Sequence, residues 1–346
     1  MKKRETDLLQ GQWDAEHLDT SEEDAERTVV YEKDAERAVA RIIFRNPEKL
    51  NALSVAALER VGDLVKQAEV DDDVKVIVFK GDGPCFGTGA DAAELGHYIG
   101  YRSGDSPAAR KRPSQRQRML PDRGIIFGAF ERTIMECLKV TIAEVHGYCY
   151  GGHMQLALAS DIVLASPDAT FTHPAFRYLG PAPQDMYLWL ENLGLHKMKE
   201  IMFTMRPLSA EEGERIGFVN KVVPRDELDY WTDEYVRAIS LMPLDGIMMG
   251  KAMMQLMMEA RGKGIGSITG WAGHGWSTNL SYAPGEWNFL KARRDLGLAG
   301  ALHQRDQMVH PFFRLGGRLH DDDNSGAGAT ADGRRANTGG EHHAAQ

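Results

Sequence analysis

Apolar residues follow two different spacings along the first half of the chain. Apolar runs of strand length lie at residues 38–44, 74–79, 140–145 and 161–165. Between the first two runs, residues 55–68 carry apolar side chains at helical spacing after Ser54, a typical N-cap. A second helix is expected to open at Gly151 and Gly152, between the last two runs. Strand, helix and strand therefore recur in order, which predicts an α/β fold with parallel strands and crossover helices.

The second half of the chain follows a mainly helical pattern. Helices are expected at residues 186–193, 197–204, 210–216, 228–240 and 245–260. The last of these carries Met248, Met249, Met253, Met254, Met257 and Met258. Such a cluster is typical of a pliable core or of a contact between subunits.

Changes of composition divide the chain into segments. They are a polar N-terminal extension (1–36), a core (37–225), a C-terminal helical region (226–312) and a tail (313–346). The ordered domain is expected to begin near Ala38, where charged sequence gives way to apolar alternation. Residues 98–123 form a basic insertion within the core. The tail is rich in glycine and poor in large apolar side chains, so we expect it to be disordered.

Composition excludes several classes of protein. The chain has 346 residues, of which 42% are hydrophobic and 26% charged, so fibrous, collagen-like and wholly disordered proteins are excluded. A formal net charge of −9 argues against a whole surface that binds nucleic acid, and leaves only a local basic patch. Cys85, Cys137 and Cys149 are too few for a disulfide framework, so a cytoplasmic location is expected. No residues have the spacing of metal ligands, and no apolar run is long enough to cross a membrane.

Two glycine-containing turns stand where predicted strands end and helices begin. They are Phe86–Asp91 and His146–Gly152. Small residues let a ligand approach the main chain, and a helix N-terminus presents unpaired N–H groups. Two such groups directed at one developing oxyanion are worth about 3–4 kcal/mol each. Together the two turns are suited to hold one oxygen atom of a substrate.

These turns belong to a longer pattern. Asn46–Leu53 precedes them and Ser160–Val163 follows them, in an order and spacing that extend over about residues 36–300. This pattern resembles the crotonase (enoyl-CoA hydratase/isomerase) superfamily. The resemblance implies an α/β spiral of ββα units with a C-terminal helical region used in trimerisation. It also implies acyl-CoA substrates, no cofactor other than the coenzyme A of the substrate, and a homo-oligomer, either a trimer or a dimer of trimers.

The resemblance assigns roles to individual residues. The main-chain N–H groups of Ala90 and Gly152 would form an oxyanion hole that stabilises a thioester enolate. The residues expected to bind the substrate are Lys49, Leu50, Ala52 and Leu53 along the coenzyme A, Thr88, Gly89 and Asp91 near its adenine and pantetheine, and Tyr148 and Tyr150 against the acyl chain.

Two positions depart from the pattern of the hydratases. Hydratases of this superfamily use one glutamate three residues after the second glycine of the Gly-Gly turn, and another after a proline in the following loop. Here these positions hold Gln155 and Ala175. An amide cannot take a proton at neutral pH, so the mechanism with two glutamates is not expected.

The loop 172–185 offers a replacement for the missing carboxylates. His173 is a candidate general base, Asp185 can hold its tautomer, and Gln155 can orient water or substrate. This arrangement resembles 6-oxocamphor hydrolase, a β-diketone hydrolase of the superfamily with a histidine and an aspartate on one loop. In the alternative interpretation, His173 is an ordinary loop residue and Asp185 caps the helix that begins at Met186.

We therefore expect a cytoplasmic lyase or carbon–carbon hydrolase that adds water to, or cleaves, a β-oxo or cyclic enoyl-CoA. The alternatives are an enoyl-CoA double-bond isomerase, a β-diketone hydrolase that does not use coenzyme A, and a non-catalytic RNA-binding member that uses the insertion at 98–123. Neither a membrane nor nucleic acid is the expected partner.

Overall fold

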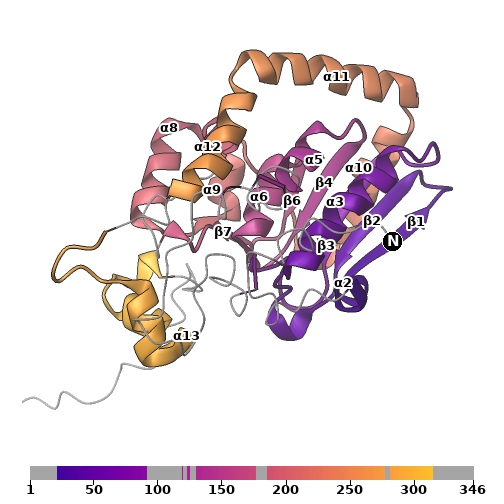
Figure 1. The fold of residues 1–346 in the computed structure, drawn as a ribbon. Coiled ribbons are helices and arrows are strands. Elements are labelled where there is room, and N and C mark those ends of the chain that lie inside the picture. Colours follow the sequence, from indigo (N-terminus) through magenta and orange to yellow (C-terminus); the bar gives the residue numbers. More distant parts are fainter. Residues whose placement is uncertain are drawn as a thin grey trace, which may run out of the picture.

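The structure is a computed structural model that describes residues 22–91, 119, 123–124, 130–176, 185–276 and 281–314 (Figure 1). The predicted tail beyond Arg314 lies outside these residues, as does the basic insertion apart from Met119 and Arg123. None of the described helices is long and apolar enough to span a membrane.

A six-stranded sheet, in the order β1-β2-β3-β4-β6-β9, forms the centre of the fold. The strands are β1 (Val29–Asp34), β2 (Val39–Phe44), β3 (Val76–Gly81), β4 (Val140–Val145), β6 (Ile162–Ala165) and β9 (Lys221–Val222). β1 pairs antiparallel with β2, and every other neighbouring pair is parallel. The predicted α/β fold with parallel strands is therefore confirmed.

The ordered fold begins earlier than the sequence analysis expected. Helix α2 (Glu22–Thr28) and strand β1 lie in the segment assigned to a polar extension. Val29 is fully buried and pairs with Phe44 at the edge of the sheet. An edge strand needs only one neighbour and few apolar side chains, so its charged composition concealed it.

The strands of the large sheet are buried on both faces, with helices on each (Figure 1). Ile77 and Phe79 belong to the core that includes α3 (Val55–Glu69). Val76 and Val78 belong to the opposite core, which includes α10 (Leu228–Ser240). The predicted N-cap of α3 is confirmed, since the Ser54 hydroxyl accepts a hydrogen bond from the Ala57 N–H at 3.2 Å.

Further helices complete the α3 side of the sheet. Helix α5 (Glu131–Glu136) packs against both α3 and α6 (Gly152–Ala159). Helix α6 also packs against α8 (Met186–Thr204), which bends at Gly194. The three helices α5, α6 and α8 therefore meet on one side of the large sheet.

A smaller sheet stands beside the large one. Its strands are β5 (Tyr148–Tyr150), β7 (Thr170–Thr172) and β8 (Leu208–Ser209), in that order. Helix α9 (Ala210–Ile216) follows β8. Short 3₁₀ helices lie at Pro47–Lys49 (η2), Arg225–Glu227 (η6) and Pro311–Phe313 (η8).

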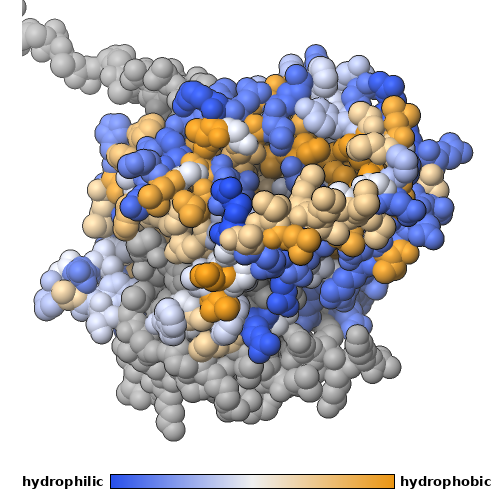
Figure 2. Space-filling model, turned by 90° about the horizontal axis from the view of Figure 1, so that it is seen from above, coloured by the Kyte–Doolittle hydropathy of each residue, from blue (hydrophilic) through white to orange (hydrophobic). Residues whose placement is uncertain are grey.

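The C-terminal region is helical, as predicted. It contains α11 (Leu244–Ala260), α12 (Lys263–Trp276) and α13 (Phe289–Gln307). Figure 1 shows α11 as a long helix along the top of the molecule. Met249, Met253 and Met257 on this helix are each more than 60% exposed, so they are not core residues of the single chain. Seen from above in Figure 2, hydrophobic side chains cover much of this face.

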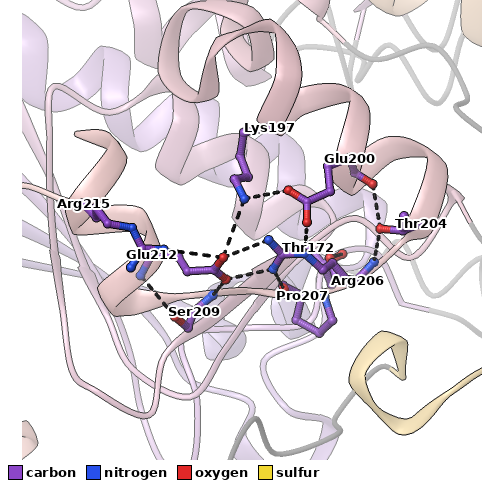
Figure 3. A network of polar contacts seen from close by, with 9 residues as sticks. All are labelled: Thr172, Lys197, Glu200, Thr204, Arg206, Pro207, Ser209, Glu212 and Arg215. Atoms are coloured by element: carbon purple, nitrogen blue, oxygen red, sulfur yellow. Dashed lines mark hydrogen bonds and ion pairs between the residues drawn. The ribbon is translucent and has the colours of Figure 1, made fainter.

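A buried arginine ties the small sheet to α8 and α9 (Figure 3). Arg206, whose side chain is 2% exposed, donates to Glu200 at 2.7 Å and to both carboxylate oxygens of Glu212 at 2.8 Å. The Thr172 hydroxyl donates to the Arg206 carbonyl at 3.4 Å, and the Thr172 carbonyl accepts from the Gly151 N–H at 3.0 Å. The ion pairs thereby support the second glycine turn.

Candidate active site

The first glycine turn is held against the loop that precedes α3. The Leu53 N–H donates to the Gly89 carbonyl, and the Asp91 N–H donates to the Leu53 carbonyl, both at 2.8 Å. Leu53 and Ala90 form a parallel β-bridge, in which the hydrogen bonds are made by Gly89 and Asp91, the neighbours of Ala90. The N–H of Ala90, between them, therefore points away from Leu53.

The two glycine turns lie directly against each other. Gly89 has φ = +87°, and a Cβ at this position would lie 2.8 Å from both the Gly152 nitrogen and the Tyr150 carbonyl oxygen. Only glycine combines this backbone conformation with so close an approach. The contact places the main chain of Ala90 beside the first residue of α6.

Ala90 and Gly152 each offer a main-chain N–H. Within the described part of the chain, neither group has an acceptor. Gly152 is the first residue of α6, where N–H groups have no partner inside the helix and carry the positive end of its dipole. The two adjoining turns therefore present donors suited to an oxygen that gains negative charge.

A buried histidine supports the first glycine turn. The His153 Nδ1 accepts a hydrogen bond from the Gly89 N–H at 3.0 Å, and its ring packs between Phe44 and Phe86. Burial lowers the pKa of His153 to about 3, so the ring is neutral at pH 7. The supporting position of His153 was not foreseen from the sequence. The largely apolar sequence of α6 was the available signal, because a helix buried all round also buries its one imidazole.

A second supporting residue, Asn51, was also missed. Its amide nitrogen donates to the carbonyls of Asp82 at 2.9 Å and Cys85 at 2.8 Å, and its amide oxygen accepts from the Asn46 N–H. An asparagine in the loop before a helix was the available signal, because asparagine tolerates the left-handed region better than most residues, and Asn51 has φ = +55°. Asn51 joins the loop before α3 to the loop that leads into the first turn.

The residues expected along the coenzyme A come together at this junction. The Lys49 ammonium lies 3.2 Å from the Asp91 carboxylate, and the Thr88 hydroxyl donates to the Leu50 carbonyl at 3.2 Å. Lys49 and Leu50 are exposed, whereas the Leu53 side chain is buried in the core. Leu53 therefore contributes through its main chain.

Tyr148 and Tyr150 lie on one face of β5, with ring centroids 5.0 Å apart. The Tyr150 hydroxyl shares a hydrogen bond of 3.1 Å with the Thr170 hydroxyl on the neighbouring strand. Between them, Cys149 points the other way and is fully buried, which raises the pKa of its thiol well above the usual value. Cys149 is thus a core residue and not a nucleophile.

His173 and Asp185 are not joined by a hydrogen bond between described atoms. The Asp185 carboxylate caps α8, accepting from the N–H groups of Tyr187 and Leu188, and also accepts from the Ser267 hydroxyl. The His173 Nδ1 accepts from the Ala175 N–H at a long 3.3 Å, and its ring lies near Phe176. The capping interpretation of Asp185 is confirmed, and the pairing expected between Asp185 and His173 is absent from the described residues.

A family model described as enoyl-CoA hydratase/isomerase matches residues 34–116 and 126–263. The chain belongs to the enoyl-CoA hydratase/isomerase family. The resemblance drawn from the glycine turns is therefore confirmed.

Members of the enoyl-CoA hydratase/isomerase family from several bacteria are similar to this chain. EchA13 of Mycobacterium tuberculosis is 30% identical over 238 residues, which span 65% of this chain and 72% of EchA13. The short-chain-enoyl-CoA hydratase of Clostridium acetobutylicum is 29% identical over 192 residues, 55% of this chain and 67% of that protein. A Mycobacterium tuberculosis protein named (7aS)-7a-methyl-1,5-dioxo-2,3,5,6,7,7a-hexahydro-1H-indene-carboxyl-CoA hydrolase is 30% identical over 182 residues, 52% of this chain and 66% of that protein.

Solved structures of the enoyl-CoA hydratase/isomerase family have the same fold. An enoyl-CoA hydratase from Mycobacterium smegmatis superposes with a TM-score of 0.68 at 26% identity, covering 81% of this chain and 94% of that one. An enoyl-CoA hydratase/isomerase from Xanthobacter autotrophicus Py2 gives 0.65 at 27% identity, covering 82% and 98%. The crotonase-type α/β fold with C-terminal helices is thereby confirmed.

The positions where family hydratases are expected to carry glutamates lie close to the second turn. Gln155 is on the first turn of α6 and is 1% exposed. Ala175 follows Pro174, whose ring would lie 3.8 Å from a Cβ on Gly151. No group of His, Cys, Asp and Glu in the described residues has the geometry of a metal site.

Proposed function

We propose that this protein binds an acyl-CoA thioester and stabilises its enolate through the main-chain N–H groups of Ala90 and Gly152. The observation that carries the proposal is the contact of the two glycine turns, each with an N–H that has no acceptor in the described residues. Because such donors are positioned before the substrate arrives, they need not reorganise as charge develops on the thioester oxygen. The names of the similar proteins, among them a short-chain-enoyl-CoA hydratase and a carboxyl-CoA hydrolase, support the same class of substrate.

The coenzyme A is proposed to follow the junction of the two loops. Lys49, Leu50, Ala52 and the main chain of Leu53 form one side of this junction, and Thr88, Gly89 and Asp91 form the other. Tyr148 and Tyr150 are proposed to contact the acyl group from β5. The proposal requires no cofactor apart from the coenzyme A of the substrate.

The reaction we propose is addition of water to, or carbon–carbon cleavage of, a β-oxo or cyclic enoyl-CoA. Gln155 orients the water or the substrate, because an amide donates and accepts hydrogen bonds but does not take up a proton. His173 is the proposed base that activates the water. Asp185 supports the site by fixing the start of α8 against Ser267.

Binding of acyl-CoA tests the proposal directly. Thermal unfolding should be recorded with free coenzyme A, acetoacetyl-CoA, crotonyl-CoA and several cyclic acyl-CoAs. A ligand that binds only the folded state at 100 times its Kd stabilises that state by about 2.7 kcal/mol, so an acyl-CoA should raise the Tm by several degrees. An unchanged Tm with every thioester, together with no turnover, would contradict an acyl-CoA enzyme.

The His173→Ala variant is expected to lose roughly 10²–10⁴-fold in kcat on the thioester that gives the largest thermal shift. Initial rates of product formation measure this loss. His196→Ala, on α8 away from the glycine turns, serves as the control and should keep the wild-type rate. Equal rates for both variants would remove His173 from the mechanism. Deuterium exchange at the α-carbon without consumption of water would favour an isomerase instead.

A homo-oligomer, a trimer or a dimer of trimers, is also proposed. The exposed methionines of α11 support it, since a single chain rarely leaves so many large apolar side chains in water. Light scattering after size exclusion should give three or six chains, and Met253→Glu with Met257→Glu should lower that number. A monomeric wild-type protein would contradict this proposal. The free, buried cysteines support the cytoplasm as the proposed location.

A further inference from the structure

Glu131 is a buried carboxyl group at the start of α5, and no feature of the sequence singled it out. Only three residues, 137–139, separate α5 from β4, so the helix runs back along the sheet opposite to the strand. The end of α5 lies at the amino edge of the sheet, where the Leu138 N–H donates to Glu69 and the Lys139 ammonium donates to the Val74 carbonyl. The start of α5 is therefore directed toward the opposite, carboxyl edge.

The same edge holds the two glycine turns. Phe86–Asp91 follows β3 and His146–Gly152 follows β4, so both turns stand beyond the carboxyl ends of parallel strands. Helix α6 begins there at Gly152 and packs against α5 and α8. Glu131 thus begins the helix beside the one whose first residue offers an N–H to the substrate.

Glu131 has a buried carboxyl oxygen that forms no hydrogen bond with a described residue. Its side chain is 1% exposed, and its Oε2 is buried with no partner in the structure as described. Burial raises the pKa of Glu131 well above its usual value, and the nearby charge of Asp185 raises it further. A buried carboxyl in this position keeps its proton at neutral pH.

Asp185 is the charged group that acts on Glu131, and the two carboxyls have different surroundings. Burial raises the pKa of Asp185 as well, but its carboxylate accepts three hydrogen bonds, from Tyr187, Leu188 and Ser267, and the Lys263 ammonium also favours its charged form. Glu131 receives no such bonds from described residues. When two neighbouring carboxyls share a site in this way, the one without hydrogen bonds holds the proton.

We propose that Glu131 is the acid that delivers a proton to the α-carbon of the enolate, an inference that rests on the proposed function. In carbon–carbon cleavage, the water oxygen bonds to the β-carbon and the water proton passes to His173. The bond between the α- and β-carbons breaks, its electron pair forms the enolate held by Ala90 and Gly152, and the α-carbon then takes the proton of Glu131. In water addition to an enoyl-CoA, the water oxygen bonds to the β-carbon and the water proton passes to His173. The electron pair of the double bond then forms the enolate of the β-hydroxyacyl thioester, whose α-carbon takes the proton of Glu131. The Glu131 carboxylate regains a proton from the imidazolium or from solvent.

No polar contact with a described residue gives this side chain a structural role. A buried polar group without a partner stabilises nothing and costs desolvation free energy, whereas a methionine would fill a similar volume without that cost. Strongly perturbed carboxyls beside a ligand site are candidates for proton transfer.

The Glu131→Gln variant tests the catalytic role, because it keeps the shape of the side chain and removes the acid. We expect kcat to fall roughly 10²–10⁴-fold while the acyl-CoA still raises the Tm as in the wild type. The wild-type rate should decline at high pH as the acid loses its proton, and this decline should be absent from the variant. Glu136→Gln is the matched control on the same helix, since Glu136 is exposed and pairs with Lys263, and it should keep the wild-type rate.

The outcomes separate this inference from the proposed function. Binding with undiminished turnover by Glu131→Gln would overturn the role of Glu131 and leave the acyl-CoA proposal intact. A wild-type protein that neither binds nor turns over any thioester would remove the proposed function, and the proton delivery with it.

A measurement without substrate tests whether Glu131 is held as a neutral acid. Its pKa is about 4.3 in the unfolded chain and well above that in the fold. The folded state therefore binds the proton more tightly, and wild-type stability should fall as pH rises from about 4.3 through the folded pKa. Within that window the unfolding equilibrium constant should increase up to about tenfold per pH unit from this group. The Glu131→Gln and Glu131→Met variants should lack this loss of stability with rising pH. Both should have a higher Tm than the wild type at pH 8. Stability curves that parallel the wild type would overturn the inference.

Discussion

Gly89→Ala is expected to reduce thioester turnover by at least the roughly 10²–10³-fold that the loss of one oxyanion donor costs. The new Cβ would meet the Gly152 nitrogen and the Tyr150 carbonyl at 2.8 Å, and both are main-chain atoms that move only with their turn. The φ of +87° adds strain for any residue with a Cβ. Both changes displace Ala90 and Gly152, so the proposed donors no longer meet one oxygen. Initial rates and acyl-CoA thermal shifts measure the effect.

Gly217→Ala is the matched control for this prediction. Gly217 ends α9 with φ = +86°, nearly the same backbone conformation, but a Cβ there would have no heavy atom within 4 Å. It should lose about 1 kcal/mol of stability and keep the wild-type rate. Equal losses of rate in the two variants would show that backbone strain alone is responsible and would argue against the contact between the turns.

Arg206→Met is expected to lower the free energy of unfolding by about 3–5 kcal/mol at pH 7. The Arg206 guanidinium is buried, and its removal leaves Glu200 and Glu212 without their main counter-charge (Figure 3). The hydrogen bond from Arg206 contributes most to lowering the pKa of Glu200, which is about 2. Urea unfolding monitored by tryptophan fluorescence gives the difference.

The pH dependence of this loss follows from the same ion pairs. The pKa values of Glu200 and Glu212 are lowered in the fold, so their stabilisation is present above about pH 4.3 and disappears as pH falls toward 2. The difference between the wild type and Arg206→Met should therefore shrink in acid.

Arg215→Met provides the control for Arg206. Arg215 pairs with the same Glu212 at 3.8 Å, but its side chain is 69% exposed. Exposed ion pairs contribute about 1 kcal/mol or less, so this variant should remain near the wild type. Similar losses for both arginines would contradict the importance of burial.

Local signals in the sequence predicted much of the fold. The bounds of α9 and α10 and the strand β4 agree with their predictions to the residue, and Ser54 caps α3 as expected. These features depend on spacing and capping within a few neighbouring residues. Strand β1 was missed because its sequence is charged. Its place in the sheet depends on its pairing with β2.

The roles of the polar residues around the site depended on distant neighbours. The sequence allowed two interpretations of Asp185, as a partner of His173 or as the cap of α8. In the structure Asp185 caps α8 and also accepts a hydrogen bond from Ser267, which is distant in the sequence. The buried position of His153 depends on Phe44 and Phe86, which enclose its ring. Nothing in the sequence singled out Glu131, because the burial that changes its pKa comes from the packing of α5 against α3 and α6.

The sequence by itself determined the family and the two glycine turns, since a main-chain donor beside a positive-φ glycine is encoded within a few residues. The tertiary structure decided which polar side chains are buried away from solvent. Burial raises the pKa values of Glu131 and Asp185 and lowers that of His153, and it depends on packing between segments that lie far apart in the chain.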